Sequence, residues 1–172
     1  WIKSYPLILG EDIAVIGEQV QTSSGPIDFL GIDTSGNTVI VELKRDKIPR
    51  EALVQAIDYA SNVADWDVDR FREICQAFAN QSLEDVLQER FEGIVVEDLA
   101  INQTQRLLLV GFAIEDSLAR MIEWLSDKYS VGINAIMLRY AKTSAGDEIL
   151  SRMVMIPEEI EKQKANKKKY II

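Results

Sequence analysis

Two carboxylates and one amine occur in a single stretch of the sequence, as Asp28, Glu42 and Lys44. Side chains alternate between the two faces of a β-strand, so Glu42 and Lys44 share a face if this stretch is a strand. Carboxylate oxygens are ligands for hard cations such as Mg²⁺. A neighbouring ammonium group can assist the attacking water or stabilise negative charge on a phosphodiester. These residue types are therefore suited to metal-dependent phosphodiester hydrolysis.

A β-hairpin would carry these residues. Residues 27–33 and 38–44 are rich in Ile, Val, Leu and Phe, which favour strands. Between them lies a run of turn-forming residues, Asp-Thr-Ser-Gly-Asn, at 33–37. Two strands joined by a short loop of this kind predict an antiparallel pair.

The register of that hairpin decides whether the carboxylates meet. A turn centred on Ser35 places Ile32 opposite Thr38 and Asp28 opposite Glu42. Like charges directly opposite each other destabilise a strand pair. Two facing carboxylates therefore need a proton or a cation between them.

The same residues also allow an interpretation in which they have structural roles and no catalytic one. Glu42 and Lys44 would pair with each other at a strand end, and Asp28 would cap a turn. A Glu-x-Lys triplet arises often by chance. The acid at a compatible register, the Gly25-Pro26 turn before it and the apolar strand around Glu42 favour the site.

The segments Pro26-Ile27-Asp28 and Glu42-Leu43-Lys44 resemble the motif of the PD-(D/E)XK nuclease superfamily, which has the restriction-endonuclease-like fold. The longer stretch GPIDFLGIDTSGNTVIVELKRDK is similar to the catalytic domain of the NucS/EndoMS type and its DUF91-like relatives. The resemblance is strong over residues 15–66 and weaker beyond. It implies an α/β fold with a mixed central β-sheet flanked by helices.

The resemblance also implies roles for individual residues. Asp28 and Glu42 would bind Mg²⁺ or Mn²⁺, with help from a backbone carbonyl such as that of Leu43. Lys44 would assist the attacking water, and Gln55 on the following helix would lie near the site. Many members carry a further acid on a helix before the first strand. Glu11 and Glu18 lie too close to the first strand to be assigned that role, and a position upstream of the first residue of this chain is the alternative.

The composition fits one soluble globular domain. Of 172 residues, 47% are hydrophobic and 27% charged. We expect a nuclease-like domain at 1–157, with a helical insertion at about 67–100 and a charged tail at 158–172. No apolar run approaches the ~20 residues of a membrane span, and no signal peptide is visible. The single cysteine, Cys75, cannot form an internal disulfide, which suits the cytoplasm; its apolar helical surroundings predict a buried, inert thiol.

The sequence contains no histidine, which excludes several mechanisms for this chain. Ser-His-Asp triads, Cys-His pairs and HExxH zinc sites all require that residue. Catalysis must therefore use carboxylates, Lys, Tyr and a metal ion.

The net charge of −9 is unusual for a protein that binds DNA. Steering depends on the local field, however, and basic residues cluster beside the proposed site. The residues expected to contact nucleic acid are Arg45, Lys47 and Arg50, with Tyr59 as a weaker candidate. The acidic residues gather elsewhere, at Glu84, Asp85, Glu89, Glu92, Glu97 and Asp98.

Periodicity predicts the remaining elements. Residues 1–10 are expected to be a helix end that Pro6 stops. A helix at 50–65 is expected to bury one apolar stripe, made of Ala52, Leu53, Ala56, Ile57, Ala60, Val63 and Ala64. The other predicted elements are strands at 13–21, 106–113, 133–140 and 148–156, and helices at 69–79, 83–91 and 117–129.

The function that these observations favour is a Mg²⁺- or Mn²⁺-dependent endonuclease acting on duplex or branched DNA, in repair or defence. A catalytically silent nuclease-fold module that binds nucleic acid or assembles with a partner is the alternative. An RNA-directed enzyme is a third possibility, because a metal site of this kind contacts only phosphate. A homodimer would supply the two sites needed to cut both strands.

Overall fold

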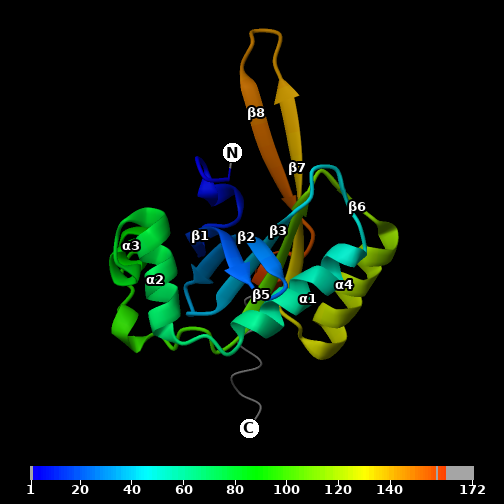
Figure 1. Cartoon of the computed structure of the whole chain (residues 1–172). Coiled ribbons are helices and arrows are strands. Elements are labelled where there is room, and N and C mark those ends of the chain that lie inside the picture. The colour runs from blue at the N-terminus through cyan, green and yellow to red at the C-terminus, as the bar shows by residue number, and fades with distance from the viewer. Residues whose placement is uncertain (1, 158, 162–172) are drawn as a thin grey trace. The chain divides into compact units, whose positions relative to one another are not determined.

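The computed structural model describes residues 2–157 and 159–161 (Figure 1). The chain divides into two compact units, each with its own strands and helices. The first unit comprises Trp1–Glu42 and Gln55–Leu107, and the second comprises Leu43–Val54 and Leu108–Ile172.

Antiparallel strands form the sheet of the first unit. They are β1 (Ile13–Thr22), β2 (Gly25–Asp33) and β3 (Thr38–Leu43), and the last residue of β3 belongs to the second unit. In the pairing of β2 with β3, Ile32 lies opposite Thr38. The predicted hairpin and the register of its turn are therefore confirmed.

The hairpin strands β2 and β3 are buried along most of their length. Leu30, Ile32 and Ile40 are fully buried, and so are their neighbours on the opposite face, Val39 and Val41. Strands covered on both faces have nearly continuous apolar sequences, which explains the absence of a polar-apolar alternation here. A charged residue within this pair is consequently placed in an apolar environment.

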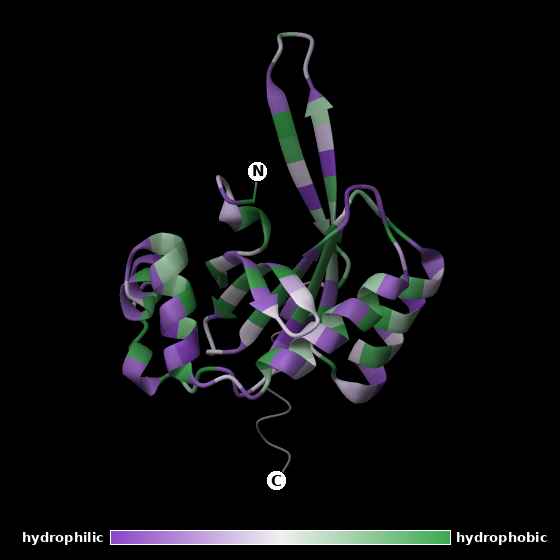
Figure 2. Ribbon diagram, in the orientation of Figure 1, coloured by the Kyte–Doolittle hydropathy of each residue, from purple (hydrophilic) through white to green (hydrophobic). Residues whose placement is uncertain are grey.

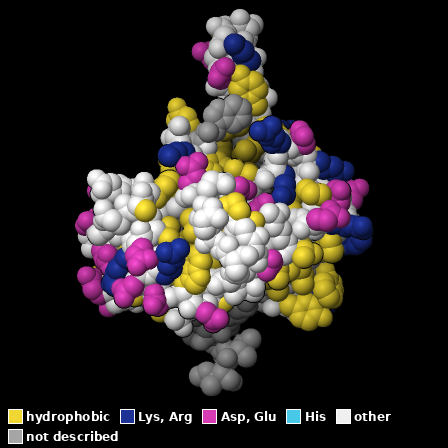
Figure 3. Space-filling view, in the orientation of Figure 1, with side chains coloured by type: hydrophobic (Ala, Val, Ile, Leu, Met, Phe, Trp, Pro, Cys, Tyr) yellow, Lys and Arg dark blue, Asp and Glu magenta, His cyan; other side chains and the backbone are white. Residues whose placement is uncertain are grey.

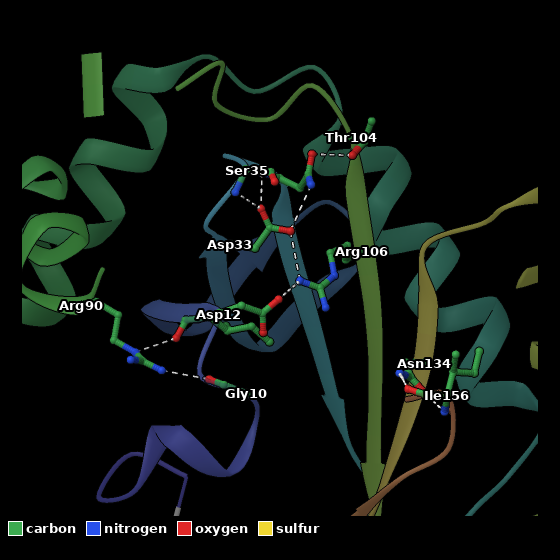
Figure 4. Close-up of polar contacts among 11 residues, drawn as sticks. Gly10, Asp12, Asp33, Ser35, Arg90, Thr104, Arg106, Asn134 and Ile156 are labelled. Carbon is green, nitrogen blue, oxygen red and sulfur yellow. Dashed lines mark hydrogen bonds and ion pairs between the residues drawn. The ribbon is translucent and has the colours of Figure 1, made fainter. Parts of the chain in front are cut away.

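The polar network around Asp33 fixes the turn between β2 and β3 (Figure 4). Its Oδ1 atom accepts the backbone amides of Ser35 and Asn37, each at 2.9 Å. Its Oδ2 atom accepts a hydrogen bond of 3.0 Å from Nη1 of Arg106, and the same nitrogen donates to Asp12 at 2.8 Å. Asp33 is only 4% exposed, so its carboxylate links the turn to Arg106 at a site largely shielded from water.

Helices α2 (Val68–Ala79) and α3 (Leu83–Arg90) pack against β1. The side chains of Asp67 and Ser82 cap them by accepting a backbone amide of the first turn, at 2.9 and 3.0 Å. The helices predicted at 69–79 and 83–91 are therefore both found. Figure 2 shows hydrophilic and hydrophobic residues intermixed along both helices, as expected for helices with one buried face.

Strand β1 departs from regular geometry next to these helices. Its pairing with β2 shifts between Val15 and Gly17, which marks a β-bulge. A Cβ atom at Gly17 would lie 2.6 Å from Val20 and 2.7 Å from Ile74 of α2, so only glycine allows the close approach. Further along the strand, Gln19 has a φ of 50°, which is uncommon for a residue other than glycine.

Helix α1 (Glu51–Val63) buries most of the predicted stripe. Two of the predicted positions are exposed: Ile57 is 48% exposed, and Ala64 is exposed just after the last residue of the helix. The apolar ring of Tyr59 occupies the buried face instead. The buried positions are Ala52, Leu53, Ala56, Tyr59 and Val63.

The second unit contains a short parallel pair, a helix and a long hairpin. Strands β4 (Lys47–Ile48) and β6 (Ala113–Ile114) are parallel. Helix α4 (Asp116–Tyr129) packs against β7 (Ile133–Lys142), which pairs antiparallel with β8 (Glu148–Val154). Residues 133–138 of β7 are buried, residues 139–142 are exposed, and the residues of β8 are exposed or half-buried.

The main sheet has the strand order β1-β2-β3-β5-β7-β8, with β5 at Gln105–Gly111. The amide of Thr38 donates to the carbonyl of Thr104, and the amide of Lys44 donates to that of Val110. Both bonds have the same offset in sequence, so β3 and β5 run in the same direction. The sheet therefore contains parallel and antiparallel pairs, and the predicted mixed α/β class is confirmed.

Two short elements differ from the sequence prediction. Pro6 begins a 3₁₀ helix, η1 (Pro6–Ile8), where it was expected to stop a helix. The fixed φ of proline suits the first helical position, which explains the difference. The pair formed by β4 and β6 was not predicted, because two residues are too few to show a period.

The long predicted elements are found, and a further 3₁₀ helix, η2 (Val96–Asp98), follows α3. The charged tail predicted at 158–172 lies outside the described residues, apart from residues 159–161. None of the described helices combines the length and apolar character needed to cross a bilayer.

Replacing Asp33 should loosen the hairpin turn. We expect Asp33→Ala to lower the free energy of unfolding by about 1–3 kcal/mol, because two backbone amides and a partly buried guanidinium lose their acceptor. Chemical denaturation measures this change. Asp58→Ala, at an exposed position of α1, is the matched control and should change stability by less than about 0.5 kcal/mol. Equal effects of the two substitutions would contradict the structural role of Asp33.

Candidate functional site

The register of the hairpin determines the placement of the two candidate acids. β2 and β3 are paired as far as Phe29 opposite Val41. One step further in the same register, Asp28 is the residue opposite Glu42. Facing residues of an antiparallel pair project from the same side of the sheet. Continued by that one step, the register would project the two carboxylates from one face, at the end of the hairpin away from its turn.

The two acids have different surroundings. Glu42 is only 3% exposed, and its Oε2 atom is buried. Asp28 is half-buried, and its Oδ1 atom accepts a hydrogen bond of 2.9 Å from the side-chain amide of Gln19 on β1. Burying a carboxylate next to a second one is costly without a cation, a proton or hydrogen-bond donors. The pair is thus placed where a positive charge would be stabilising.

Lys44 follows Glu42 by two residues and is half-buried. Its amide donates to the carbonyl of Val110 at 2.8 Å, which extends the line of β3 by one residue. Because side chains alternate along an extended chain, Lys44 lies on the same side of that chain as Glu42.

Glycine at position 111 lets the segment after β3 pack closely on β5. A Cβ atom there would lie 2.6 Å from Ile48, 3.0 Å from the carbonyl oxygen of Asp46 and 3.3 Å from that of Lys44. The amide of Phe112 donates to the same Asp46 carbonyl at 2.9 Å. The backbone from Lys44 to Ile48 is consequently held at several points, although it contains only two strand residues.

The start of α1 is anchored by Glu115. Its amide donates to the carbonyl of Ile48 at 3.1 Å, and its carboxylate accepts the amide of Arg50 at 3.1 Å. The guanidinium of Arg50 also pairs with Glu51 at 3.2 Å. The pKa of Glu51 is lowered, first by a backbone hydrogen bond and then by Arg50. Arg45, Lys47 and Arg50, the residues predicted to contact nucleic acid, are all exposed.

Gln55 and Tyr59 interact as their spacing on α1 suggests. The side-chain amide of Gln55 donates to the hydroxyl of Tyr59 at 3.0 Å. A Cβ atom on Gly25 would lie 3.5 Å from that hydroxyl, so this pair reaches the first residue of β2. Tyr59 is only 3% exposed, which makes direct stacking on a nucleic acid unfavourable for it. Its hydroxyl instead orients Gln55.

The donor set of this site suits a hard divalent cation. Asp28 and Glu42 offer carboxylate oxygens from neighbouring strands. Within the residues that the structure describes, no group of three His, Cys, Asp or Glu side chains is arranged to hold a metal. Mg²⁺ is commonly bound through one or two carboxylates, with water and phosphate completing its coordination. Two acids therefore fit that ion.

Two acidic residues of α2 and α3 form ion pairs, and the cysteine is buried. On α2 and α3, Arg72 pairs with Asp69 and with Glu84, each at 2.8 Å. Figure 3 shows acidic and basic side chains intermixed on the left of the view and hydrophobic ones gathered at its lower right. Cys75 is fully buried, as predicted, and burial raises the pKa of its thiol to about 11. Such a thiol is a poor nucleophile at neutral pH.

Gln19 was not identified from the sequence. It lies in a predicted strand, and a neutral polar residue there gives no signal by itself. In the structure, β1 pairs Glu18 with Phe29 and Val20 with Ile27, which places Gln19 opposite Asp28. The sequence does not reveal this pairing, because the bulge in β1 shifts the alignment of the two strands.

A family model described as the endonuclease NucS C-terminal domain matches residues 1–107. The endonuclease NucS of Aeropyrum pernix is 44% identical to this chain over 52 residues. That match covers 30% of this chain and 20% of the relative. The family match confirms the resemblance found in the sequence.

The solved structures that this chain matches include an EndoMS–dsDNA complex, at 18% identity and a TM-score of 0.47. The alignment covers 79% of this chain and 41% of that one. A repair endonuclease from Pyrococcus abyssi has 20% identity and a TM-score of 0.46, covering 77% of this chain and 42% of the other. This chain thus spans about two fifths of each of these proteins.

Enlarging Gly111 should displace the segment that carries Lys44. We expect Gly111→Val to lower the free energy of unfolding by about 1–3 kcal/mol, because its side chain would overlap Ile48 and the Asp46 carbonyl. Thermal or denaturant unfolding checks this expectation. Ser144→Ala, in the exposed turn between β7 and β8, is the control. Unchanged stability in Gly111→Val would refute the close approach described above.

Proposed function

The chain belongs to the family of endonuclease NucS C-terminal domains, and on that basis we propose that it hydrolyses phosphodiester bonds of DNA with a divalent cation. The observation that supports this proposal is the β2–β3 register, which runs as far as Phe29 opposite Val41 and, continued by one residue, would bring Asp28 opposite Glu42. The activity of the longer relatives enters only as part of the proposal, since this chain matches a fraction of their length.

Asp28 and Glu42 are proposed to hold Mg²⁺ or Mn²⁺, with the carbonyl of Leu43 as a third oxygen donor. The burial of Glu42 supports this role, because a cation would offset the cost of keeping its carboxylate charged in an apolar environment. A bound divalent ion would stabilise charge on the phosphate and lower the pKa of the attacking water. Oxygen donors favour Mg²⁺ and Mn²⁺ over softer metals.

Lys44 is proposed to orient the attacking water or to stabilise negative charge that develops on the phosphate. Its place two residues after Glu42 supports that role. Gln55 is proposed to position water or phosphate at the same site, with its amide oriented by the hydroxyl of Tyr59. The absence of histidine from the sequence leaves this lysine as the basic group nearest to the two acids along the chain.

Arg45, Lys47 and Arg50 are proposed to contact the DNA backbone. They are exposed and follow directly after the catalytic lysine, on a segment whose backbone is held against β5. Salt-dependent attraction to phosphates is the main source of non-specific DNA affinity. With a net charge of −9, the chain is expected to bind DNA weakly. A second copy would provide the second site for a double-strand cut.

Removing either acid should abolish cleavage. We expect Glu42→Ala and Asp28→Ala to reduce Mn²⁺-dependent cleavage of plain, nicked, flapped or mismatched duplexes by roughly a hundredfold or more, because charge stabilisation at the phosphate is lost. Gel assays of labelled DNA measure the rate. Glu92→Ala, an exposed acid outside the site, is the control. Cleavage that survives Glu42→Ala would remove this residue from the mechanism.

Calorimetry with Mn²⁺ separates the enzyme from a silent module of the same fold. Binding heat that disappears in Asp28→Ala, together with cleavage, supports the proposal. Metal binding without cleavage of any DNA or RNA tested would favour a module that binds nucleic acid or a partner.

Neutralising the basic segment should weaken DNA binding. We expect the triple replacement of Arg45, Lys47 and Arg50 by Gln to lower affinity and to reduce the slope of log K against log salt concentration by up to about 3. Fluorescence anisotropy at several salt concentrations measures both quantities. The matched control removes the same charge elsewhere, through replacement of Arg120, Lys128 and Lys142, which are also exposed. Equal losses in the two variants would refute the placement of the DNA surface.

A further inference from the structure

We infer that Gln19 is a positioning residue that holds the Asp28 carboxylate in the orientation needed to bind the divalent cation, an inference that rests on the function proposed above. The contact that carries it is the hydrogen bond from Nε2 of Gln19 to Oδ1 of Asp28, at 2.9 Å. The two residues come from neighbouring strands, β1 and β2.

The backbone at Gln19 indicates that this contact is held against a conformational cost. Its φ is 50°, a left-handed conformation within a β-strand. A residue other than glycine pays for that conformation, and such residues persist where the surrounding structure determines them. They concentrate at functional sites.

The burial pattern of β1 shows how the strand bends at this point. Glu18 and Gln19 are both exposed, whereas Gly17 and Val20 on either side are buried. Strict alternation would place one of the two middle residues inside. The left-handed backbone conformation of Gln19 therefore keeps its side chain outside the core, where the side-chain amide hydrogen-bonds to Asp28. The side-chain amide of Gln21 donates to the carbonyl of Gln19 at 3.3 Å and adds support from the same strand.

A neutral donor is chemically suited to this place. An amide fixes the orientation of a carboxylate without cancelling its negative charge, so the acid still attracts a cation. A lysine or arginine at position 19 would instead form an ion pair and compete with that cation. Residues that hydrogen-bond to metal ligands typically contribute 10–100-fold to metal affinity.

Two variants separate the amide from the backbone. Gln19→Met keeps the length of the side chain and removes the donor. Gln19→Gly also removes the donor but relieves the left-handed strain, because glycine adopts positive φ readily. Gln88→Met, at an exposed position of α3, is the matched control. The measurements are Mn²⁺ affinity by calorimetry, melting temperature, and the side-chain amide resonances of Gln19 in metal-free protein with and without Asp28→Asn.

The expected result is a loss of about tenfold or more in Mn²⁺ affinity in both Gln19 variants, with a melting temperature in Gln19→Gly no lower than in the wild type. The Gln19 amide resonances should shift in Asp28→Asn without any metal. Wild-type affinity in both variants would overturn the role of Gln19 alone. A loss in Gln19→Met that Gln19→Gly restores would also overturn it, because the effect would then come from the backbone. Absence of Asp28-dependent Mn²⁺ binding in the wild type would overturn the proposed function itself.

Discussion

The register of the β2–β3 hairpin is the constraint on which the site depends. A strand has a side-chain period of two, so a slip of one residue would turn Asp28 to the opposite face. Asp33 prevents such a slip, because its carboxylate accepts two backbone amides of the turn and the guanidinium of Arg106. A buried polar network at one end of the hairpin thereby sets which residue faces Glu42 at the other end.

Close backbone approach is the second requirement, and glycine meets it at two places. At Gly17 the side chains of Val20 and Ile74 come within the space of a Cβ atom, so α2 can lie directly on β1. At Gly111 the segment after β3 comes equally close to β5. Neither glycine takes part in chemistry, but each allows a close contact next to the proposed site. Local packing of this kind explains how a short irregular segment can present lysine and arginine side chains in a defined way.

Long elements with a clear period could be predicted from the sequence, and features that depend on tertiary packing could not. The apolar residues around Asp28 and Glu42 and the Asp-Thr-Ser-Gly-Asn turn predicted the hairpin. Most of the buried face of α1 was predicted as well. Tyr59 was left out of it, because its polar hydroxyl, which accepts a hydrogen bond from Gln55, does not suggest burial. Nothing in the sequence indicated that Gln19 would leave the regular strand conformation. The β-bulge earlier in the same strand lies where Gly17 approaches Ile74 of α2, and a local sequence pattern contains no such tertiary contact.

The strongly negative net charge is compatible with the proposed chemistry when charges are considered locally. On α2 and α3, ion pairs with Arg72 already engage Asp69 and Glu84. At the hairpin end, two carboxylates and one divalent cation would sum to zero. The charge of a phosphodiester would then be balanced by Lys44 and the exposed basic residues after it. A site of this kind needs little surplus positive charge, so overall acidity limits non-specific DNA affinity more than it limits binding of one phosphate at the metal.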